Sequence, residues 1–366
     1  MSVTDSEFMA RALRLAERGI YSTSPNPRVG CVLVKNQSVI AEAWHQRAGE
    51  GHAEILALEQ AGENAKDSTC YASLEPCNHS GRTGPCTKAL IDAGVSRVVY
   101  AMEDPNPLTA GAGVETLRAK GVQVDGPLME KEAARINAGF VKRMSTGRPF
   151  VRLKMAMSLD GRTAMSDGNA FWITGPRARA DVQRYRARSC VVLSGWKSVQ
   201  KDNSQMTVRP EEFELDEENV GDRQPLRVLV DSHLQLDKKA RFFQAESPIL
   251  VANLEREGAG DAEHIKYLKV DAEENHLDLD NLLDKLGEME INELFVESGS
   301  ELSGAFMRAG LVDELLVYVA PKLMGSDARS LFELPLQKMA ESLPLHIKEI
   351  RQIGGDIRIT AMPEME

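Results

Sequence analysis

The sequence predicts an α/β protein made of two consecutive domains. Segments with strand character and segments with helical periodicity alternate along both halves of the chain. A cluster of turn-forming residues, Ser-Thr-Gly-Arg-Pro at 145–149, interrupts this alternation, and a new strand pattern begins directly after it. A length of 366 residues suits two domains of ordinary size. We therefore expect one domain at residues 1–146 and a second at 147–366.

The first half is expected to alternate helices and strands up to that cluster. Apolar residues at helical spacing predict the helices, and short apolar runs bounded by turn residues predict the strands. Asn36 and Gln37 predict a hairpin tip. The expected helices are 6–20, 53–60, 88–93, 114–120 and 129–143, and the expected strands are 31–34, 38–44, 70–74, 96–102 and 122–124.

The second half is expected to be rich in strands. Thr174 suits the N-cap of a helix and Pro176 suits its first turn. The acidic stretch 211–222 is expected to be an exposed insertion. The expected helices are 177–188, 275–286 and one that ends at 309; the expected strands are 150–157, 190–193, 226–231, 249–252, 265–270, 293–297 and 315–321, followed by a terminal hairpin of 346–353 and 357–361.

His52, Glu54, Cys77 and Cys86 form the most informative pattern in the chain. One imidazole and two thiols are good zinc ligands, and a catalytic zinc site keeps its fourth position for water. The metal lowers the pKa of that water to about 7, and Glu54 is placed to move its proton as a general acid and base. The layout is that of zinc-dependent nucleobase deaminases, with a longer loop, 78–85, between the thiols.

Alternative interpretations of this pattern remain open. The two cysteines can be ordinary buried thiols. A structural zinc site would use four protein ligands, and His45 or His79 is available as the fourth.

Two polar turns accompany the metal pattern. The glycine-rich loop between the thiols carries Arg82 and suits a phosphate, with an ordinary solvated turn as the alternative. A proline-fixed turn presents Asn26 and Arg28, which suit a ligand as an amide and a cation. An asparagine in a turn often bonds its own backbone instead.

Composition excludes several classes of protein. A formal net charge of -11 and an aromatic content of 5% argue against broad nucleic-acid binding. No apolar run approaches the length of a membrane span, and the first residues lack the core of a signal peptide. Five cysteines, with two assigned to zinc, do not form a disulfide framework. We expect a cytoplasmic protein.

The second half offers two candidate anion sites. The expected helix at 177–188 is strongly basic, which is usual for a solvated face but also suits a phosphate in an acidic protein. A glycine-bearing turn at 298–304 follows an expected strand and opens a helix, an arrangement that presents free N–H groups to anions. By itself such a turn is more often only the connection between a strand and a helix than an anion site.

Both halves together resemble one family, the bifunctional deaminase/reductase of riboflavin biosynthesis, over nearly the whole chain. In the first half the resemblance rests on Asn26-Pro27-Arg28-Val29-Gly30, His52-Ala53-Glu54, Glu75-Pro76-Cys77, His79, Gly81-Arg82-Thr83, Cys86 and Asp104-Pro105-Asn106-Pro107. In the second half it rests on Leu153-Lys154, Ser158-Leu159-Asp160-Gly161, Trp172-Ile173-Thr174, Arg186-Ala187, Thr207-Val208-Arg209, Val230-Asp231-Ser232 and Glu297-Ser298-Gly299.

The resemblance implies a cytidine-deaminase-like three-layer domain followed by a dihydrofolate-reductase-like domain. The first would use Zn²⁺ to deaminate 2,5-diamino-6-(ribosylamino)-4(3H)-pyrimidinone 5′-phosphate at its ring 2-amino group. The second would use NADPH to reduce the ribosyl chain to ribityl. Both partners are then small molecules, and the family resemblance leads us to expect a homo-oligomer, a dimer or a tetramer.

The resemblance also implies which residues bind each ligand. Those that would contact NADP are Ala156, Trp172, Ser198, Asp202, Ser232, Gly299, Ser300, Glu301, Leu302, Ser303, Gly304 and Ala305. Those that would contact substrate are Asn26, Arg82, Ala170, Arg186, Met206, Arg209 and Glu297. Ala170 stands where family members often have Ser, and Ser300 and Gly84 each replace a usual Pro.

Two other classes of function remain. One is a nucleobase or polynucleotide deaminase with an accessory domain, for which binding to RNA or single-stranded DNA is the discriminating observation. The other is a non-enzymatic zinc-stabilised module, which would have a fourth protein ligand on the metal.

Overall fold

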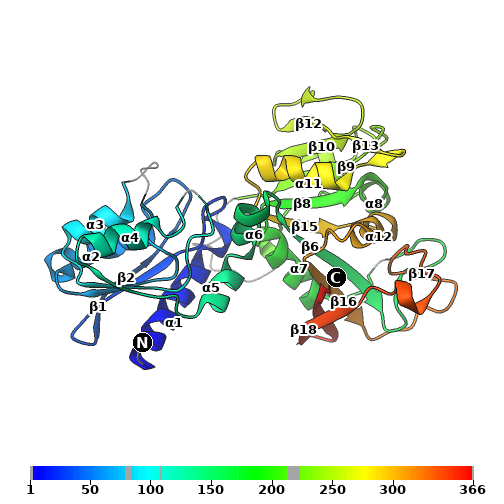
Figure 1. The fold of residues 1–366 in the computed structure, drawn as a ribbon. Coiled ribbons are helices and arrows are strands. Elements are labelled where there is room, and N and C mark those ends of the chain that lie inside the picture. The colour runs from blue at the N-terminus through cyan, green and yellow to red at the C-terminus, as the bar shows by residue number, and fades with distance from the viewer. Residues whose placement is uncertain (1–2, 79–83, 108, 171, 213–222, 365–366) are drawn as a thin grey trace. The chain divides into compact units, whose positions relative to one another are not determined.

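The structure is a computed structural model that describes residues 3–364, apart from 79–83, 108, 171 and 213–222. The described residues form two compact units that divide between Gly147 and Arg148 (Figure 1). Each unit has its own hydrophobic core, so the sequence expectation of two α/β domains is confirmed. The acidic stretch expected to be an insertion lies mostly outside the described residues.

The first unit is built on one five-stranded sheet with the order β2-β1-β3-β4-β5. The first two pairings, β1 with β2 and β1 with β3, are antiparallel, and the remaining two are parallel. Its elements are α1 (Val3–Glu17), β1 (Gly30–Lys35), β2 (Ser38–Trp44), α2 (Ala53–Ala61), β3 (Thr69–Ala72), α3 (Cys86–Asp92), β4 (Arg97–Tyr100), α4 (Ala112–Ala119), β5 (Gln123–Asp125), α5 (Glu130–Ile136) and α6 (Ala138–Thr146).

Helices cover both faces of this sheet, which gives the expected three layers. Strand β1 is buried almost throughout, as a strand covered on both faces must be. Gly30 faces α1 so closely that a Cβ there would lie 2.0 Å from the carbonyl oxygen of Ala12. The next residue, Cys31, points to the opposite face and lies near Glu54 of α2.

One expected helix of this unit proves to be two. The span predicted as 129–143 divides into α5 and α6 at Asn137, whose backbone leaves helical geometry. Its side chain accepts a hydrogen bond from the Arg28 N–H at 2.8 Å and donates one to the Arg28 carbonyl at 2.9 Å. The Arg28 guanidinium donates to the Ile136 carbonyl, so it holds this junction and is not presented to a ligand.

The second unit is built on one ten-stranded sheet with the order β11-β12-β10-β9-β8-β15-β6-β16-β19-β18. In Figure 1 this sheet runs from β12 at the top of the unit to β18 at its bottom. The seven strands from β12 to β16 run parallel. Its elements are β6 (Phe150–Ser158), β7 (Arg162–Ala164), α7 (Pro176–Arg188), β8 (Val191–Gly195), α8 (Trp196–Asp202), β9 (Leu226–Val230), α10 (Arg241–Gln244), β10 (Ile249–Asn253), β11 (Gly258–Ala259), β12 (Ile265–Lys269), β13 (Ala272–Glu273), β14 (His276–Leu277), α11 (Leu279–Glu288), β15 (Glu293–Glu297), α12 (Ser300–Arg308), β16 (Glu314–Ala320), β17 (Arg329–Ser330), β18 (Leu345–Ile353) and β19 (Asp356–Pro363).

The parallel core of this sheet positions the second site. Strands β6, β8, β9 and β15 are neighbours, so their carboxyl ends meet at one edge of the sheet. Open parallel sheets bind ligands outside that edge. The polar residues that follow these strand ends are therefore brought together although they are far apart in sequence.

The start of α7 differs from its prediction by one residue. Gly175, not Thr174, is the N-cap, and Pro176 occupies the first turn as expected. Gly175 is extended, and its N–H donates to the Asp356 carboxylate at 2.7 Å. The Thr174 carbonyl accepts a hydrogen bond from Arg179 instead.

Candidate active sites

His52, Cys77 and Cys86 converge in the first unit. Their ligand atoms all lie within 4.8 Å of one another. The Nδ1 atom of His52 is 3.2 Å from the Cys86 sulfur and 3.5 Å from the Cys77 sulfur. One nitrogen and two sulfurs in this arrangement fit zinc, which uses N and S donors at tetrahedral positions.

Two helix starts and the segment that follows β3 supply these ligands. His52 is the N-cap of α2, and Cys86 is the first residue of α3. The Cys86 N–H points at the Cys77 sulfur at 3.4 Å. Hydrogen bonds from Cys86 lower the pKa of Cys77 to about 4 and so favour its thiolate, which is the form in which cysteine binds a metal.

Glu54 lies beside this cluster in the first turn of α2 and is only 3% exposed. Burial raises its pKa from 4.5 to about 7, and a negative charge on Cys77 adds to the increase. A carboxyl group that titrates near neutral pH suits transfer of protons in both directions.

His45 is not a fourth ligand, because both of its ring nitrogens have other partners. Its Nδ1 lies 3.0 Å from the Gly51 carbonyl oxygen and its Nε2 lies 3.1 Å from the Asn26 amide nitrogen. Burial lowers the pKa of His45, which favours a neutral ring that donates from Nδ1 and accepts at Nε2. His79, the other candidate, and Arg82 lie outside the described residues.

The hydrogen bond between His45 and Asn26 brings Asn26 to the metal cluster. The rings of His45 and His52 meet edge to face with 5.5 Å between their centroids. Because His45 takes the amide nitrogen of Asn26, the orientation of that amide is fixed. The turn that the sequence singled out therefore borders the zinc centre.

A cavity of about 1390 Å³ occupies the carboxyl edge of the sheet in the second unit. It is large enough for a dinucleotide and a second ligand, since ordinary ligand pockets measure roughly 300–1,000 Å³. Most of the residues expected to contact NADP or substrate in this unit line it, namely Ala156, Ala170, Trp172, Arg186, Ser198, Asp202, Met206, Arg209, Ser232, Glu297, Gly299, Ser300, Glu301, Leu302 and Ala305.

Two expected cofactor residues lie elsewhere on α12. Ser303 is fully buried, and its hydroxyl is 2.8 Å from that of Ser298. Gly304 packs so closely on the segment after β17 that a Cβ would lie 2.5 Å from the Glu333 carbonyl oxygen. Ser303 and Gly304 therefore hold α12 in place, and the first turn of this helix faces the cavity.

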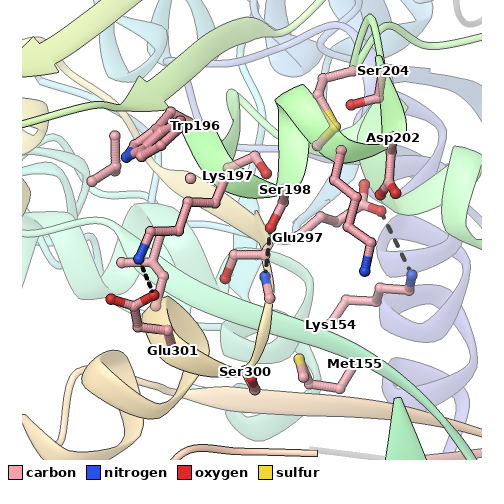
Figure 2. A pocket seen from close by; sticks show the side chains of 18 of the residues that line it. Lys154, Met155, Trp196, Lys197, Ser198, Asp202, Ser204, Glu297, Ser300 and Glu301 are labelled. Carbon is pink, nitrogen blue, oxygen red and sulfur yellow. Dashed lines mark hydrogen bonds and ion pairs between the residues drawn. The ribbon is translucent and has the colours of Figure 1, made fainter. Parts of the chain in front are cut away.

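Lys154 is a cavity residue that sequence reasoning did not place in a site. It projects from β6 and lies 3.7 Å from the Glu297 carboxylate (Figure 2). The same carboxylate accepts a hydrogen bond from Arg186 at 3.1 Å. Asp202 is near enough to interact with Lys154 electrostatically. One signal in the sequence could have identified Lys154 as a site residue. It is a lysine within the apolar run of a central strand, where an unpaired charge is costly.

The turn before α12 is tied to α8. The Gly299 N–H donates to the Ser198 hydroxyl at 2.9 Å, and Lys197 forms an ion pair with Glu301 at 2.7 Å (Figure 2). A Cβ at Gly299 would lie 3.2 Å from that hydroxyl. The helix starts of α8 and α12 thus form one wall, which suits the phosphates of a dinucleotide.

Comparisons with known proteins follow the same division of the chain. The profile of the cytidine and deoxycytidylate deaminase zinc-binding region matches residues 2–102, and that of the RibD C-terminal domain matches residues 149–359. The riboflavin biosynthesis protein RibD of Escherichia coli (strain K12) is 47% identical over 360 residues, which are 96% of this chain and 98% of that protein. The chain belongs to the RibD family.

Solved RibD structures agree over the full length. Acinetobacter baumannii RibD has a TM-score of 0.91 at 42% identity, with 99% of each chain covered. A deaminase/reductase from Thermotoga maritima, described as diaminohydroxyphosphoribosylaminopyrimidine deaminase/5-amino-6-(5-phosphoribosylamino)uracil reductase, has a TM-score of 0.88 at 31% identity and covers 98% of this chain and 99% of its own.

Membership of the RibD family confirms several expectations. The chain is a bifunctional deaminase/reductase of riboflavin biosynthesis, with a zinc-binding deaminase unit and an NADPH-using reductase unit. The cytidine-deaminase-like and dihydrofolate-reductase-like folds are confirmed. A nucleobase or polynucleotide deaminase with an accessory domain is not supported, because the second unit is itself a RibD reductase domain. Among the described residues, no helix has the length and apolarity to cross a membrane.

Proposed function

We propose that the deaminase unit hydrolyses 2,5-diamino-6-(ribosylamino)-4(3H)-pyrimidinone 5′-phosphate at ring carbon 2. Water provides the new 2-oxo group, and the 2-amino group leaves as ammonia. Zinc at His52, Cys77 and Cys86 supplies, when bound, the Lewis acidity that makes water nucleophilic at neutral pH. The observation that supports this role most directly is the buried Glu54 carboxyl group beside those three ligands.

Glu54 serves as the proton carrier in this proposal. It takes a proton from the attacking water and delivers protons to the ring nitrogen and to the departing amine. Its pKa of about 7 allows both transfers near neutral pH. Asn26, oriented by His45, binds the pyrimidine edge, and Arg82 binds the substrate phosphate.

The reductase unit, in this proposal, reduces the deaminated product in the large cavity. The C1′–O4′ bond of the ribosyl ring breaks as O4′ takes a proton, and the exocyclic nitrogen forms an iminium with C1′. NADPH, when bound, supplies the hydride that C1′ accepts. Lys154 donates the proton: it lines the cavity, its ammonium lies 3.7 Å from the Glu297 carboxylate, and it interacts electrostatically with Asp202.

The remaining cavity residues bind and orient the two ligands. Arg186 is held by the Glu297 carboxylate and donates to the Thr207 carbonyl at 3.0 Å, which fixes its guanidinium for the substrate. Met206 and Arg209, on the same segment, and Ala170 complete the substrate side. Ser198, Asp202, Ser232 and the first turn of α12 would hold the cofactor, together with Ala156 and Trp172, which line the same cavity.

One incubation tests both halves of this proposal. The enzyme is mixed with the diaminopyrimidinone ribosyl phosphate, and ammonia and NADPH absorbance are followed with and without added NADPH. Ammonia should appear in both mixtures, and NADPH should be consumed only after ammonia appears. NADPH oxidation without ammonia release would contradict the proposed order of reactions.

We also propose that the enzyme is a cytoplasmic homo-oligomer. The five cysteines are all free thiols in the structure, which suits a reducing compartment. The reductase unit exposes apolar side chains in one region, as a subunit that associates with itself does. Mass measurement in solution tests this, and a monomer at all concentrations would contradict it.

A further inference from the structure

Nine lysine and arginine side chains of the described chain line the large cavity of the reductase unit. Seven of them have an acceptor within the protein: four form ion pairs with Glu297, Glu301 or Glu212, and three donate hydrogen bonds to Thr174, Gln205 or Glu333. The other two, Lys201 and Arg329, have no hydrogen bond or ion pair with the residues that the structure describes. These two cations are therefore available to a ligand.

Gly168 is the place where the two available cations meet. A Cβ added to this glycine would lie 2.6 Å from the Lys201 Nζ and 3.3 Å from the Arg329 Nη2. Both charged groups thus converge on the same side of Gly168, whose φ of +87° and missing side chain leave room for them. Two positive charges this close repel each other, and an anion bound between them would remove the repulsion.

Two separate segments hold the cations at this point. Lys201 lies in the last turn of α8. Arg329 belongs to β17, where it pairs with Ala164 of β7. The chain then turns back after β7 to Gly168, whose N–H donates to the Met165 carbonyl at 2.8 Å. The convergence therefore depends on the tertiary fold and is not a run of charge along one surface helix.

A hollow of about 300 Å³ adjoins the two cations. Its wall includes Gly168, Ala170 and Lys201, and the last two also line the large cavity, so the hollow opens into that cavity. Ala170 has only a methyl group to offer a ligand. Recognition of a charged group in this hollow therefore falls to the cations.

Two carboxylates also line the hollow, and each has other interactions. Asp167 accepts the N–H of Asn169 at 2.7 Å. Asp202 interacts electrostatically with both Lys154 and Lys201. Neither carboxylate forms an ion pair with Lys201 or Arg329 among the described contacts, so the positive charge at Gly168 is only partly offset.

Both ligands of the reductase carry phosphate, and the position of α8 separates them. The cofactor phosphates suit the wall at the start of this helix, beside Ser198. Lys201 lies in its last turn, and a helix of seven residues is about 10 Å long. The cations at Gly168 therefore lie on the side of the cavity that holds Ala170 and the proposed substrate.

We propose that Lys201 and Arg329 bind the 5′-phosphate of the reductase substrate. The proposal rests on the reductase reaction proposed above and names two residues that recognise its substrate. Lys154 donates its proton to O4′, and the carbon that carries O4′ also carries the phosphorylated 5′ carbon. Because Asp202 interacts with both Lys154 and Lys201, the two lysines are close enough to serve these neighbouring parts of one ligand.

Lys201→Met in the full-length enzyme tests this assignment, with substrate that has been deaminated beforehand. The KM for this substrate should rise by about tenfold, near the lower end for a hydrogen bond to a charged group, because the Lys201 side chain is exposed. The KM for the dephosphorylated substrate should equal that of the wild type, and so should the KM for NADPH. Arg329→Met should have the same effects.

Two further variants show whether the charge is what matters. Lys201→Arg keeps a cation at this position and should recover most of the substrate binding. Lys269→Met removes an exposed lysine of β12 that does not line the cavity, so it is the matched control and should leave all three KM values at those of the wild type.

Each other outcome has a distinct meaning. A higher KM for NADPH with an unchanged KM for substrate would assign the cations to a cofactor phosphate and overturn the proposal. An equal rise for phosphorylated and dephosphorylated substrate would mean that the two residues only shape the cavity, and unchanged constants in both methionine variants would exclude them from binding. A wild type that does not oxidise NADPH with the deaminated substrate would instead contradict the proposed reduction itself, and the phosphate site with it.

Discussion

The Lys154 ammonium lies 3.7 Å from the Glu297 carboxylate, which is held in turn by the Arg186 guanidinium at 3.1 Å. The carboxylate therefore interacts with two cationic side chains that line the same cavity. Burial lowers the pKa of Lys154, and the pull of Glu297 opposes this only in part. A lysine in this state gives up its proton more readily than a solvated one, which suits the donor role proposed for it.

The reductase should lose activity at alkaline pH earlier than an ordinary lysine would allow. The active form of Lys154 is protonated, so the rate falls as pH rises through its pKa. Since burial lowers that pKa, the fall should begin below the usual lysine value of about 10.4. The measurement is kcat/KM for NADPH oxidation between neutral pH and pH 11.

Lys154→Arg provides the check on that assignment. A guanidinium stays protonated across this range, so the alkaline fall should disappear while the absolute rate drops. An alkaline fall at the same pH in the variant would assign the titration to a different group.

Arg227 should prove essential for stability of the reductase unit. It is completely buried and donates to the carbonyls of Gln205, Phe242, Ala245 and Ser247. Arg227→Met leaves these buried acceptors without a donor, and we expect a loss of about 3 kcal/mol or more in the free energy of unfolding. Urea denaturation followed by tryptophan fluorescence measures it. Arg256→Met, on an exposed arginine, should change stability little.

A site could be predicted from the sequence where the residues that form it lie close together along the chain. His52, Glu54, Cys77 and Cys86 lie within one short stretch and have few alternative uses, so the metal centre was predictable. The role of Asn137 was not, because the backbone that it binds belongs to Arg28, 109 residues earlier. A helical pattern continues through such a residue and gives no sign of the break.

The reductase site shows the same limit. Alternating strands and helices predicted the sheet, but not which strands are neighbours, and only the sheet order brings Lys154 to Glu297. A bulge in β18 is likewise invisible in the sequence, since Ile347 and Ile350 lie on opposite faces of a regular strand. Contacts between distant segments decide these features.

Glu54→Gln should abolish ammonia release and keep the metal. Glutamine has nearly the same shape but cannot carry a proton, so a decrease of about 10²–10⁴ in deaminase kcat is expected. Zinc content by atomic absorption should equal that of the wild type, because Glu54 is not among the ligands. Cys77→Ser, in contrast, should lose the metal and the activity together. Normal turnover by the Glu54 variant would remove this residue from the mechanism.

Arg82→Ala should weaken substrate binding without loss of zinc. If the loop between the thiols holds the phosphate, loss of the Arg82 side chain should weaken the free energy of substrate binding by about 1.5–3 kcal/mol, the range for a hydrogen bond to a charged group. The increase in deaminase KM should shrink for the dephosphorylated substrate. An equal increase for both substrates would indicate that Arg82 acts on loop folding instead.

The two activities should fail independently within one chain. All three proposed zinc ligands belong to the unit that ends at Gly147, and the described residues that line the large cavity all belong to the unit that follows. Removal of zinc by a chelator should therefore stop ammonia release and spare reduction of substrate deaminated beforehand. Asp202→Ala should do the reverse: it alters the charge beside Lys154, so NADPH oxidation should fall while ammonia release continues.

An equal mixture of the Glu54→Gln and Asp202→Ala enzymes should then convert substrate to the reduced product, because each supplies the step that the other lacks. If the mixture releases ammonia but forms no reduced product, the intermediate does not pass through solution between chains, and the two sites are not independent catalysts.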